Sequence, residues 1–375
     1  MPLFDIARAV EDQFHRDVIP TLKRRGWRPR VVAYDGYGSS ATAPGGGDMA
    51  RVLARMVLRP ADAPTEGPLF RSLPEKRPAS AAEVLDNARI SLADAQRGWR
   101  LFIDAPVPHL PVTITVGDAR VRTRADREGY IDVVVRGHGL GAGWHDTVID
   151  AAGAGRSTAR VLVVGPEPTL GIISDIDDTA MISHVPRMLV AAWNQLVKYS
   201  SAREPVPGMA RLYRRVQQAH GGAPVFYLST GAWNVMPTLR AFFSRHGFPE
   251  GPALMTDWGP TNTGWFRSGI EHKRTELRRL MIDLPQVRWL LVGDDGQHDP
   301  LIYGEAAREH ADRVAAVAIR RLSATEQVLA GGITAHPMGI GPAARTLAEA
   351  DVPVVVGSNG FELATRLPAS IIGRA

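Results

Sequence analysis

The chain has 375 residues, of which 45% are apolar and 22% charged, and this composition excludes general disorder and fibrous architectures. Its length is enough for two folded domains, since single cores stop growing at roughly 250–300 residues. It contains no cysteine, so disulfides and thiol nucleophiles are excluded, while a mild net charge of +5 selects no partner.

The chain opens with an amphipathic pattern. Residues 3–22 carry apolar side chains at steps of three and four, which predicts a helix within an N-terminal segment 1–28. The basic run Lys23-Arg24-Arg25 at its end is compatible with peripheral membrane contact, although packing on a domain is the commoner use of such a stripe. No apolar run approaches the ~20 residues that cross a bilayer, and no signal-peptide layout is present, so we expect a cytoplasmic protein.

Residues 29–165 predict a β-rich, sandwich-like domain of antiparallel strands. Short runs rich in β-branched residues alternate with clusters of Gly, Pro and Asp, as in sandwiches. The expected strands cover 31–34, 112–116, 130–135 and 159–164. The segment 36–47, rich in Gly, Ser and Ala, predicts a mobile loop. No catalytic cluster is evident in this half.

Residues 166–375 predict an α/β domain with a Rossmann-like parallel sheet. Buried apolar runs alternate with helical stretches after Pro166, the pattern of parallel strands with crossover helices. The expected strands cover 170–174, 225–228, 287–292, 314–319 and 354–356. Ligands of such sheets bind beyond the carboxyl ends of the strands, and three of these ends carry acids or hydroxyls.

The first of these strand ends carries a dense acidic run. Asp175, Asp177, Asp178 and Thr179 follow the strand within five positions, a charge density that is costly unless a cation neutralises it. Mg²⁺ favours such a set, because it is held by one or two carboxylates and by phosphate oxygens. The alternative is an acidic turn that caps the next helix.

Two further strand ends support the metal interpretation. Ser229-Thr230-Gly231 follows the second strand at an expected helix start, where backbone N–H groups hold phosphate. Asp294, Asp295 and Asp299 follow the third, without the spacing of an EF-hand loop. His298 beside them is more often simply solvated.

Lys273 is a candidate for the cation on phosphoryl oxygens. It begins a helical stretch between the second and third strand ends, and it is one of four lysines among 44 basic residues. Lysine delivers a compact point charge, although a lysine on a predicted helix is ordinarily exposed to solvent.

The order of these parts resembles the haloacid dehalogenase superfamily: Asp-x-Asp-x-Thr, a strand ending in Ser, a Lys, and Gly-Asp with a further acid. More narrowly, the chain from 166 to 375 resembles the actin-patch-type phosphatidate phosphatase catalytic domain. The segments that carry this resemblance are Asp175 to Thr179, Pro205 to Met209, Tyr227 to Ser229, Trp233-Asn234, His272-Lys273 and Gly293 to Tyr303. The sequence departs from that pattern at Thr230-Gly231-Ala232 and at Asp295.

The resemblance implies roles for individual residues. Asp175 would be the nucleophile that forms an aspartyl-phosphate, Asp177 the general acid and then base, and Ser229 and Lys273 the groups that hold phosphoryl oxygens. Substrate contacts would come from Thr179, Thr230, Gly231 and Asn234. Mg²⁺ would be bound by Asp175, the backbone carbonyl of Asp177 and Asp294, with Asp299 or Asp295 in support.

The expected function is a Mg²⁺-dependent phosphatase that converts phosphatidate to diacylglycerol, with a phospholipid substrate and no nucleic acid partner. One alternative keeps the chemistry and changes the substrate to a soluble phosphomonoester, such as a sugar phosphate, a nucleotide or a polynucleotide end. Another is a non-catalytic membrane- or protein-binding module on a retired phosphatase fold. Because every catalytic residue type is present, the first expectation is preferred.

Overall fold

The computed structural model describes residues 19–40, 47–61, 105–182, 204–256, 269–296, 298–329 and 351–373. The expected N-terminal helix lies largely outside these residues, and only helix α2 (Ile19–Arg24) is described there. The chain divides into two compact units. One comprises Met1–Tyr34, Arg51–Val135 and Asp146–Arg160, and the other Asp35–Ala50, Arg136–His145 and Val161–Ala375.

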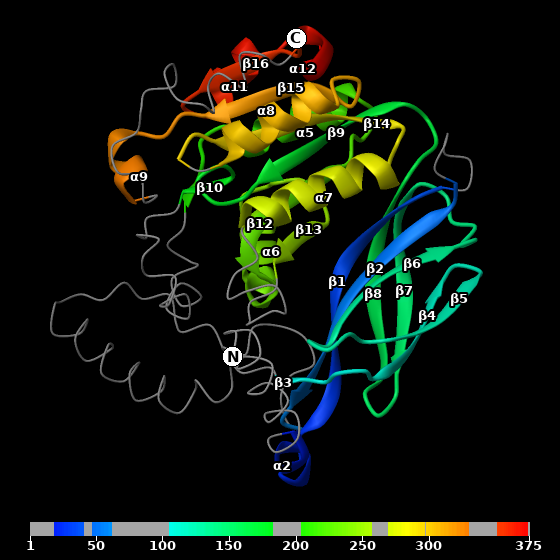
Figure 1. Ribbon diagram of the computed structural model, residues 1–375. Helices are drawn as coiled ribbons and strands as arrows, with labels where there is room; N and C mark the ends of the chain where they lie inside the picture. Colours follow the sequence, from blue (N-terminus) through cyan, green and yellow to red (C-terminus); the bar gives the residue numbers. More distant parts are fainter. Residues whose placement is uncertain are drawn as a thin grey trace, which may run out of the picture. The chain divides into compact units, whose positions relative to one another are not determined.

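The β-rich half forms one curled sheet of eight strands, not the two facing sheets of a sandwich (Figure 1). The strand order is β3-β2-β1-β8-β7-β4-β5, and β6 pairs with β2. The strands are β1 (Arg28–Ser39), β2 (Met49–Arg59), β3 (Ala105–Pro106), β4 (Pro111–Val116), β5 (Ala119–Arg124), β6 (Tyr130–Arg136), β7 (Gly143–Ala151) and β8 (Gly155–Val164).

Two expectations for this half were wrong. Strands β1 and β8 pair in parallel, with Gly36 opposite Val161 and Ser39 opposite Val164, so the sheet is not purely antiparallel. Residues 36–39 of the segment expected to be a mobile loop form instead the buried end of β1, and residues 41–46 of that segment lie outside the described residues. Ladder pairing to β8 satisfies the backbone groups of this Gly- and Ser-rich stretch and overrides its weak strand propensity.

The α/β half contains the expected parallel sheet, with six strands in the order β13-β12-β9-β14-β15-β16. Every neighbouring pair is parallel. The strands are β9 (Thr169–Asp175), β12 (Val225–Ala232), β13 (Ala253–Thr256), β14 (Val287–Asp294), β15 (Val314–Arg320) and β16 (Val354–Gly357). Strands β9, β14 and β15 are buried almost throughout, as expected for strands covered on both faces.

The topology of this sheet has a switch point between β9 and β14. The chain leaves β9 toward β12 and β13, then returns to β14 on the other side of β9 and continues to β15. Helices α7 (Gly269–Asp283) and α8 (Asp299–Glu309) contact each other and lie on one face of the sheet (Figure 1). The carboxyl ends of β9 and β14 therefore border the crevice where ligands of such sheets bind.

The remaining described elements complete this half. Helix α5 (Met209–Ala219) contacts α11 (Gly360–Arg366) and α12 (Ala369–Ile372). Helices α6 (Met236–Arg245) and α9 (Ala324–Leu329), the 3₁₀ turn Trp233–Val235, and the small antiparallel pair β10 (Met181–Ile182) and β11 (Glu204–Pro205) make up the rest.

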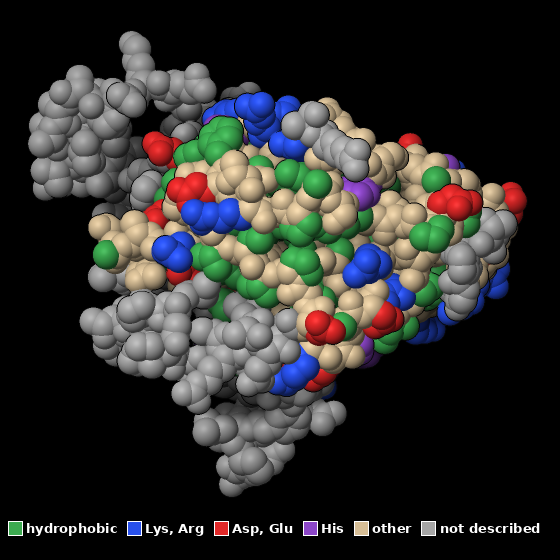
Figure 2. All heavy atoms as spheres, turned by 90° about the horizontal axis from the view of Figure 1, so that it is seen from above, with side chains coloured by type: hydrophobic (Ala, Val, Ile, Leu, Met, Phe, Trp, Pro, Cys, Tyr) green, Lys and Arg blue, Asp and Glu red, His purple; other side chains and the backbone are tan. Residues whose placement is uncertain are grey.

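In the described part of the chain, no helix has both the length and the hydrophobicity needed to span a membrane. The face of the molecule shown in Figure 2 mixes basic, acidic and hydrophobic side chains among its described residues. On that face, as in the sequence, charge alone selects no partner.

Candidate active site

The end of β9 delivers Asp175 into the crevice. The strand is buried from Leu170 onward and runs between β12 and β14, so its last side chain emerges at the switch point with only 2% exposure. The chain then turns sharply, because the backbone N–H groups of Ala180 and Met181 both donate to the carbonyl of Ile176.

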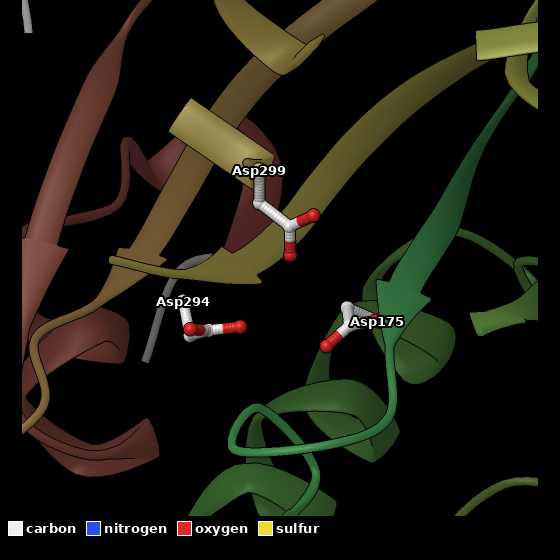
Figure 3. Close-up of side chains that lie close together, drawn as sticks. All are labelled: Asp175, Asp294 and Asp299. Atoms are coloured by element: carbon white, nitrogen blue, oxygen red, sulfur yellow. The ribbon is translucent and has the colours of Figure 1, made fainter. Parts of the chain in front are cut away.

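Asp294 and Asp299 lie beside Asp175. Asp294 ends β14, and Asp299 begins α8 five residues later. All three carboxylates are buried and offer oxygens within 4.8 Å of one another. Figure 3 shows them facing a common space from the ends of two strands and the start of one helix. Asp175 lies 119 positions before Asp294 in the sequence, and the fold brings these two acids together.

Lys273 reaches this cluster from α7. Its side chain is nearly completely buried, and Nζ lies 2.7 Å from Asp175 Oδ1 and 2.6 Å from Asp299 Oδ1. It is therefore not an exposed helix lysine. The ammonium has three N–H donors. Two are directed at these carboxylates, which leaves the third available to a ligand.

The cluster has unsatisfied oxygens that fit a hard cation. Among the described residues, Oδ2 of Asp175, Asp294 and Asp299 is buried and has no hydrogen-bond partner. Buried polar atoms are normally paired, so three orphaned carboxylate oxygens in one place require an explanation. Oxygen-only donors of this kind suit Mg²⁺ better than softer metals, and three acids outnumber the one lysine.

The pKa values of the cluster reflect this excess of negative charge. Burial raises the pKa of Asp175 to about 7, although Lys273 opposes the shift, and Asp299 adds to it. The pKa of Asp294 lies well above its ordinary value, chiefly through burial and then through Asp299 and Asp175. Burial alone would lower the pKa of Lys273, but the two neighbouring carboxylates outweigh it and raise that pKa. A bound divalent cation inverts this balance and favours the ionised acids.

Ser229 lies within β12, directly after Leu228, which pairs with Asp175 of β9, and it is buried. Its Oγ accepts a hydrogen bond from the backbone N–H of Gly231 at 2.9 Å, so its own proton is available to an acceptor. The expected helix start at 229–231 was wrong, because β12 continues to Ala232 and α6 begins at Met236. The carbonyls of Thr230 and Gly231 accept from Thr256 Oγ1, which ties this strand extension to β13.

The other expected site residues occupy different settings. Asp177 is half-buried in the turn after β9, outside the three-carboxylate cluster. Thr179 is buried, and its Oγ1 has no hydrogen-bond partner among the described residues. Asn234 lies in the 3₁₀ turn that follows β12.

The alternative ligand Asp295 faces a different neighbour. Its Oδ1 accepts a hydrogen bond from the backbone N–H of Leu322 at 2.8 Å, and burial raises its pKa. His298 is exposed, immediately before α8. Of the two supporting acids considered from the sequence, the geometry favours Asp299.

Two residues near the site were missed by the sequence analysis. Tyr213 of α5 lies beside Ser174, the residue before Asp175, with its Oη 2.6 Å from Ser174 Oγ, and no local signal marks it. Arg320 at the end of β15 donates to the backbone carbonyl of Asp178 at 2.7 Å. A signal for the second existed in Ser323-Ala324-Thr325-Glu326, a capping-box pattern that places a helix start directly after this arginine.

Fold and site together define a parallel α/β protein with a buried carboxylate and lysine centre at its topological switch point. Residues 170–321 match the family model described as the catalytic domain of phosphatidate phosphatase APP1. For this part of the chain, the match confirms the resemblance to the actin-patch-type phosphatidate phosphatase catalytic domain.

Two yeast proteins are similar to part of the chain. Phosphatidate phosphatase APP1 of Saccharomyces cerevisiae is 24% identical over 152 residues, 40% of this chain and 26% of that protein. An uncharacterised protein of Schizosaccharomyces pombe is 26% identical over 155 residues, 40% of this chain and 25% of that protein. The chain thus matches about a quarter of the length of these relatives.

Solved structures are only distantly similar. A carbohydrate acetylesterase from Xanthomonas citri aligns with 12% identity and a TM-score of 0.28, covering 70% of this chain and 68% of that one.

Proposed function

We propose that this protein is a Mg²⁺-dependent phosphatase of the haloacid dehalogenase type, with phosphatidate as substrate and diacylglycerol as product. The observation that carries the proposal is the buried cluster in which Lys273 joins Asp175 to Asp299 while three carboxylate oxygens remain orphaned. The family match over 170–321 and the name of the Saccharomyces cerevisiae relative support the choice of substrate.

Asp175, Asp294 and Asp299 would hold the cation, with the backbone of Asp177 as a further ligand. When bound, Mg²⁺ supplies positive charge to the phosphoryl oxygens, whose own negative charge otherwise repels a nucleophile. The third N–H of Lys273 and the hydroxyl proton of Ser229 are both available for hydrogen bonds to the same oxygens. Such preset donors stabilise charge where it develops in the transition state.

The reaction would proceed in two displacements. An oxygen of Asp175 attacks phosphorus and the bond to the lipid oxygen breaks, while Asp177 donates a proton to that leaving oxygen. Water then attacks phosphorus and gives a proton to Asp177. The bond from phosphorus to Asp175 breaks, so that phosphate leaves, Asp175 is again a carboxylate and Asp177 is again protonated.

The test is phosphate release from phosphatidate, with and without Mg²⁺, by the whole chain and by Asp175→Asn. We expect the variant to lose turnover and keep its fold, because the amide is nearly isosteric with the acid but is neither anionic nor nucleophilic. Activity of Asp175→Asn close to that of the unaltered chain would refute the mechanism.

A substrate panel separates the lipid from soluble alternatives. Phosphatidate in micelles is compared with a sugar phosphate, a nucleotide and a 5′-phosphorylated oligonucleotide at equal phosphate concentration. We expect the highest kcat/KM on phosphatidate. Equal or better turnover of a soluble ester would keep the chemistry and overturn the lipid assignment, while turnover of none would favour a non-catalytic module.

A further inference from the structure

Arg320 is a buried cation that the catalytic scheme above does not use. It is the last residue of β15, only 4% exposed, and it lies opposite Asp294 in the ladder between β14 and β15. Burying a guanidinium is costly unless its donors are paired. Here Nη1 donates to the carbonyl of Asp178, Nη2 to Glu326 Oε1 at 2.5 Å, and Nε to the carbonyl of Ser358 at 3.3 Å.

The most informative of these partners is Asp178, which follows the expected general acid. Its φ is +59°, in the left-handed region that costs a typical non-glycine residue roughly 1–2 kcal/mol. Strained backbone of this kind persists only where the surroundings hold it. Two contacts do so at Asp178: its N–H donates to the carbonyl of Met181 at 2.7 Å, and its carbonyl accepts from Arg320.

Glu326 in turn fixes the arginine. One of its carboxylate oxygens accepts from Arg320, and the other accepts from the backbone N–H of Ser323 at 2.8 Å. Ser323 Oγ accepts from the N–H of Glu326 at 3.3 Å, which completes the reciprocal capping box at the start of α9. These contacts and the hydrogen bond Nη1 makes to the Asp178 carbonyl hold the guanidinium in one orientation.

The same segment also touches the second acidic loop. The N–H of Asp295 donates to the carbonyl of Arg320 at 3.0 Å, and Asp295 Oδ1 accepts from the N–H of Leu322. Residues 320–326 therefore hold the turn after Asp175 on one side and the loop after Asp294 on the other.

We propose that Arg320, oriented by Glu326, is a positioning residue that holds the Asp178 turn and thereby keeps Asp177 in place for proton transfer to the leaving oxygen. This inference rests on the proposed phosphatase function. It assigns no contact with substrate to Arg320, which acts through the backbone of its neighbour.

The first test measures Arg320→Lys on two phosphate esters that differ in how much proton donation their leaving oxygen needs. An aryl ester with a good leaving group, p-nitrophenyl phosphate, needs little proton donation, whereas an alkyl ester such as glycerol phosphate needs much. General acid catalysis is worth roughly 10²–10⁴-fold, so a misplaced Asp177 should lower kcat on the alkyl ester by about tenfold or more and on the aryl ester by less than about threefold. Lysine keeps the charge but lacks the planar fork that reaches several acceptors at once.

The matched control is Arg313→Lys. Arg313 precedes the other end of β15, and its Nη2 also donates to backbone carbonyls, those of Met281, Leu284 and Val287. We expect Arg313→Lys to have lower thermal stability and an unchanged ratio of the two rates.

Glu326→Gln serves as a milder second variant, because it keeps a capping oxygen and removes the charge partner of Arg320. It should shift the ratio of the two rates in the same direction as Arg320→Lys. Equal loss on both esters in Arg320→Lys, or the same ratio change in Arg313→Lys, would overturn the proposal.

A second readout does not depend on activity. Amide hydrogen exchange in residues 176–182 of the whole chain should be faster in Arg320→Lys than in the unaltered protein, and unchanged in Arg313→Lys. Unchanged exchange in Arg320→Lys would overturn the positioning role whatever the rates. If the unaltered chain turned over neither these two esters nor phosphatidate, the proposed function would fail, and the exchange result would still decide whether Arg320 holds the turn.

Discussion

The three buried acids at the centre of the site are held by two kinds of partner. Asp175 and Asp299 share Lys273, while Asp294 Oδ1 accepts a backbone N–H from Gly296 at 2.8 Å. The cluster therefore contains three buried carboxyl groups and one ammonium, which contacts two of them. Without a further cation, the surplus acid must be buried ionised or take up a proton, and either course costs stability.

This imbalance predicts opposite effects of Asp294→Asn on stability and on metal response. The pKa of Asp294 is raised in the folded chain, so at neutral pH, above its unfolded pKa, this carboxyl destabilises the fold. The amide removes that cost while its oxygen can still accept from Gly296, and we therefore expect the unfolding free energy measured in EDTA to rise. With Mg²⁺ present, the unaltered chain should gain thermal stability and the variant should gain little.

The control for this prediction is Asp295→Asn, the neighbouring acid whose carboxylate accepts from Leu322. It should keep the stabilisation by Mg²⁺, as measured by thermal unfolding across a magnesium titration. A variant Asp294→Asn that is less stable in EDTA and still responds fully to Mg²⁺ would contradict the assignment. A loss of response in Asp295→Asn would add that residue to the ligands.

At this scale, the sequence identified those groups whose position follows from strand ends. Asp175 and Asp294 could be predicted because parallel strands end at one edge of a sheet. Lys273 could be predicted because it lies in the chain between the second and the third strand ends. The capping box after Arg320 marks a helix start, but the contact of Arg320 with Asp178 could not be predicted, since the two residues lie 142 positions apart and no pattern encodes the turn conformation of Asp178. The structure shows where these groups lie, and the catalytic, substrate-binding and metal-binding roles of all the site residues remain predictions.

At the scale of elements, the junction of β14 and α8 depends on Gly293. A Cβ built there would lie 2.5 Å from Asp299 Oδ2 and 2.7 Å from Asp299 Cβ, closer than real side chains approach. Strand β14 therefore has no room for a side chain at residue 293, beside the first residue of α8. The glycine before Asp294 is what allows α8 to bring Asp299 against the strand end.

We therefore expect Gly293→Ala to displace Asp299 and weaken metal binding. The magnesium concentration for half-maximal activity should rise about tenfold or more, with roughly 1–3 kcal/mol lost in unfolding free energy from overpacking. Gly165→Ala is the control, because its Cβ would make an ordinary contact of 3.4 Å with Ala142. Both quantities are measured by magnesium titration and denaturant unfolding; an unchanged magnesium requirement in Gly293→Ala would show that Asp299 is not a ligand.

Elements were predictable where hydrophobic pattern and burial agree. The long apolar runs of β9, β14 and β15 gave correct strands, because these strands are covered on both faces. Strand β13, only four residues long, and β2, whose arginines interrupt its apolar run, were missed. The extension of β12 to Ala232 follows a register shift after Leu228, a tertiary feature without a local signature.

At the scale of the whole molecule, the change in sequence pattern near residue 166 does not coincide with the division of the structure. The compact unit that holds the site also includes Asp35–Ala50 and Arg136–His145. Tyr37, fully buried, donates from its hydroxyl to Asp283 Oδ2 at 2.8 Å, and its ring packs edge-on against Phe226. Phe226 packs in the same way against Trp289 of β14. Hydrophobic periodicity reports the secondary structure of a segment and carries no information about such distant partners.

This arrangement predicts that a fragment of residues 166–375 is much less stable than the whole chain. Its loss of Tyr37 alone resembles an aromatic-to-alanine change in a core, about 3–5 kcal/mol, and Gln286 also loses its hydrogen bond to the carbonyl of Gly165. Thermal unfolding and solubility of the fragment are compared with those of the whole chain, and with the whole chain carrying Tyr37→Ala. We expect Tyr37→Ala to lose, in the whole chain, a large part of the stability that the fragment loses. A fragment as stable as the whole chain would instead establish residue 166 as an independent domain boundary, because the contacts of Tyr37 with Asp283 and Phe226 would then contribute nothing to its stability.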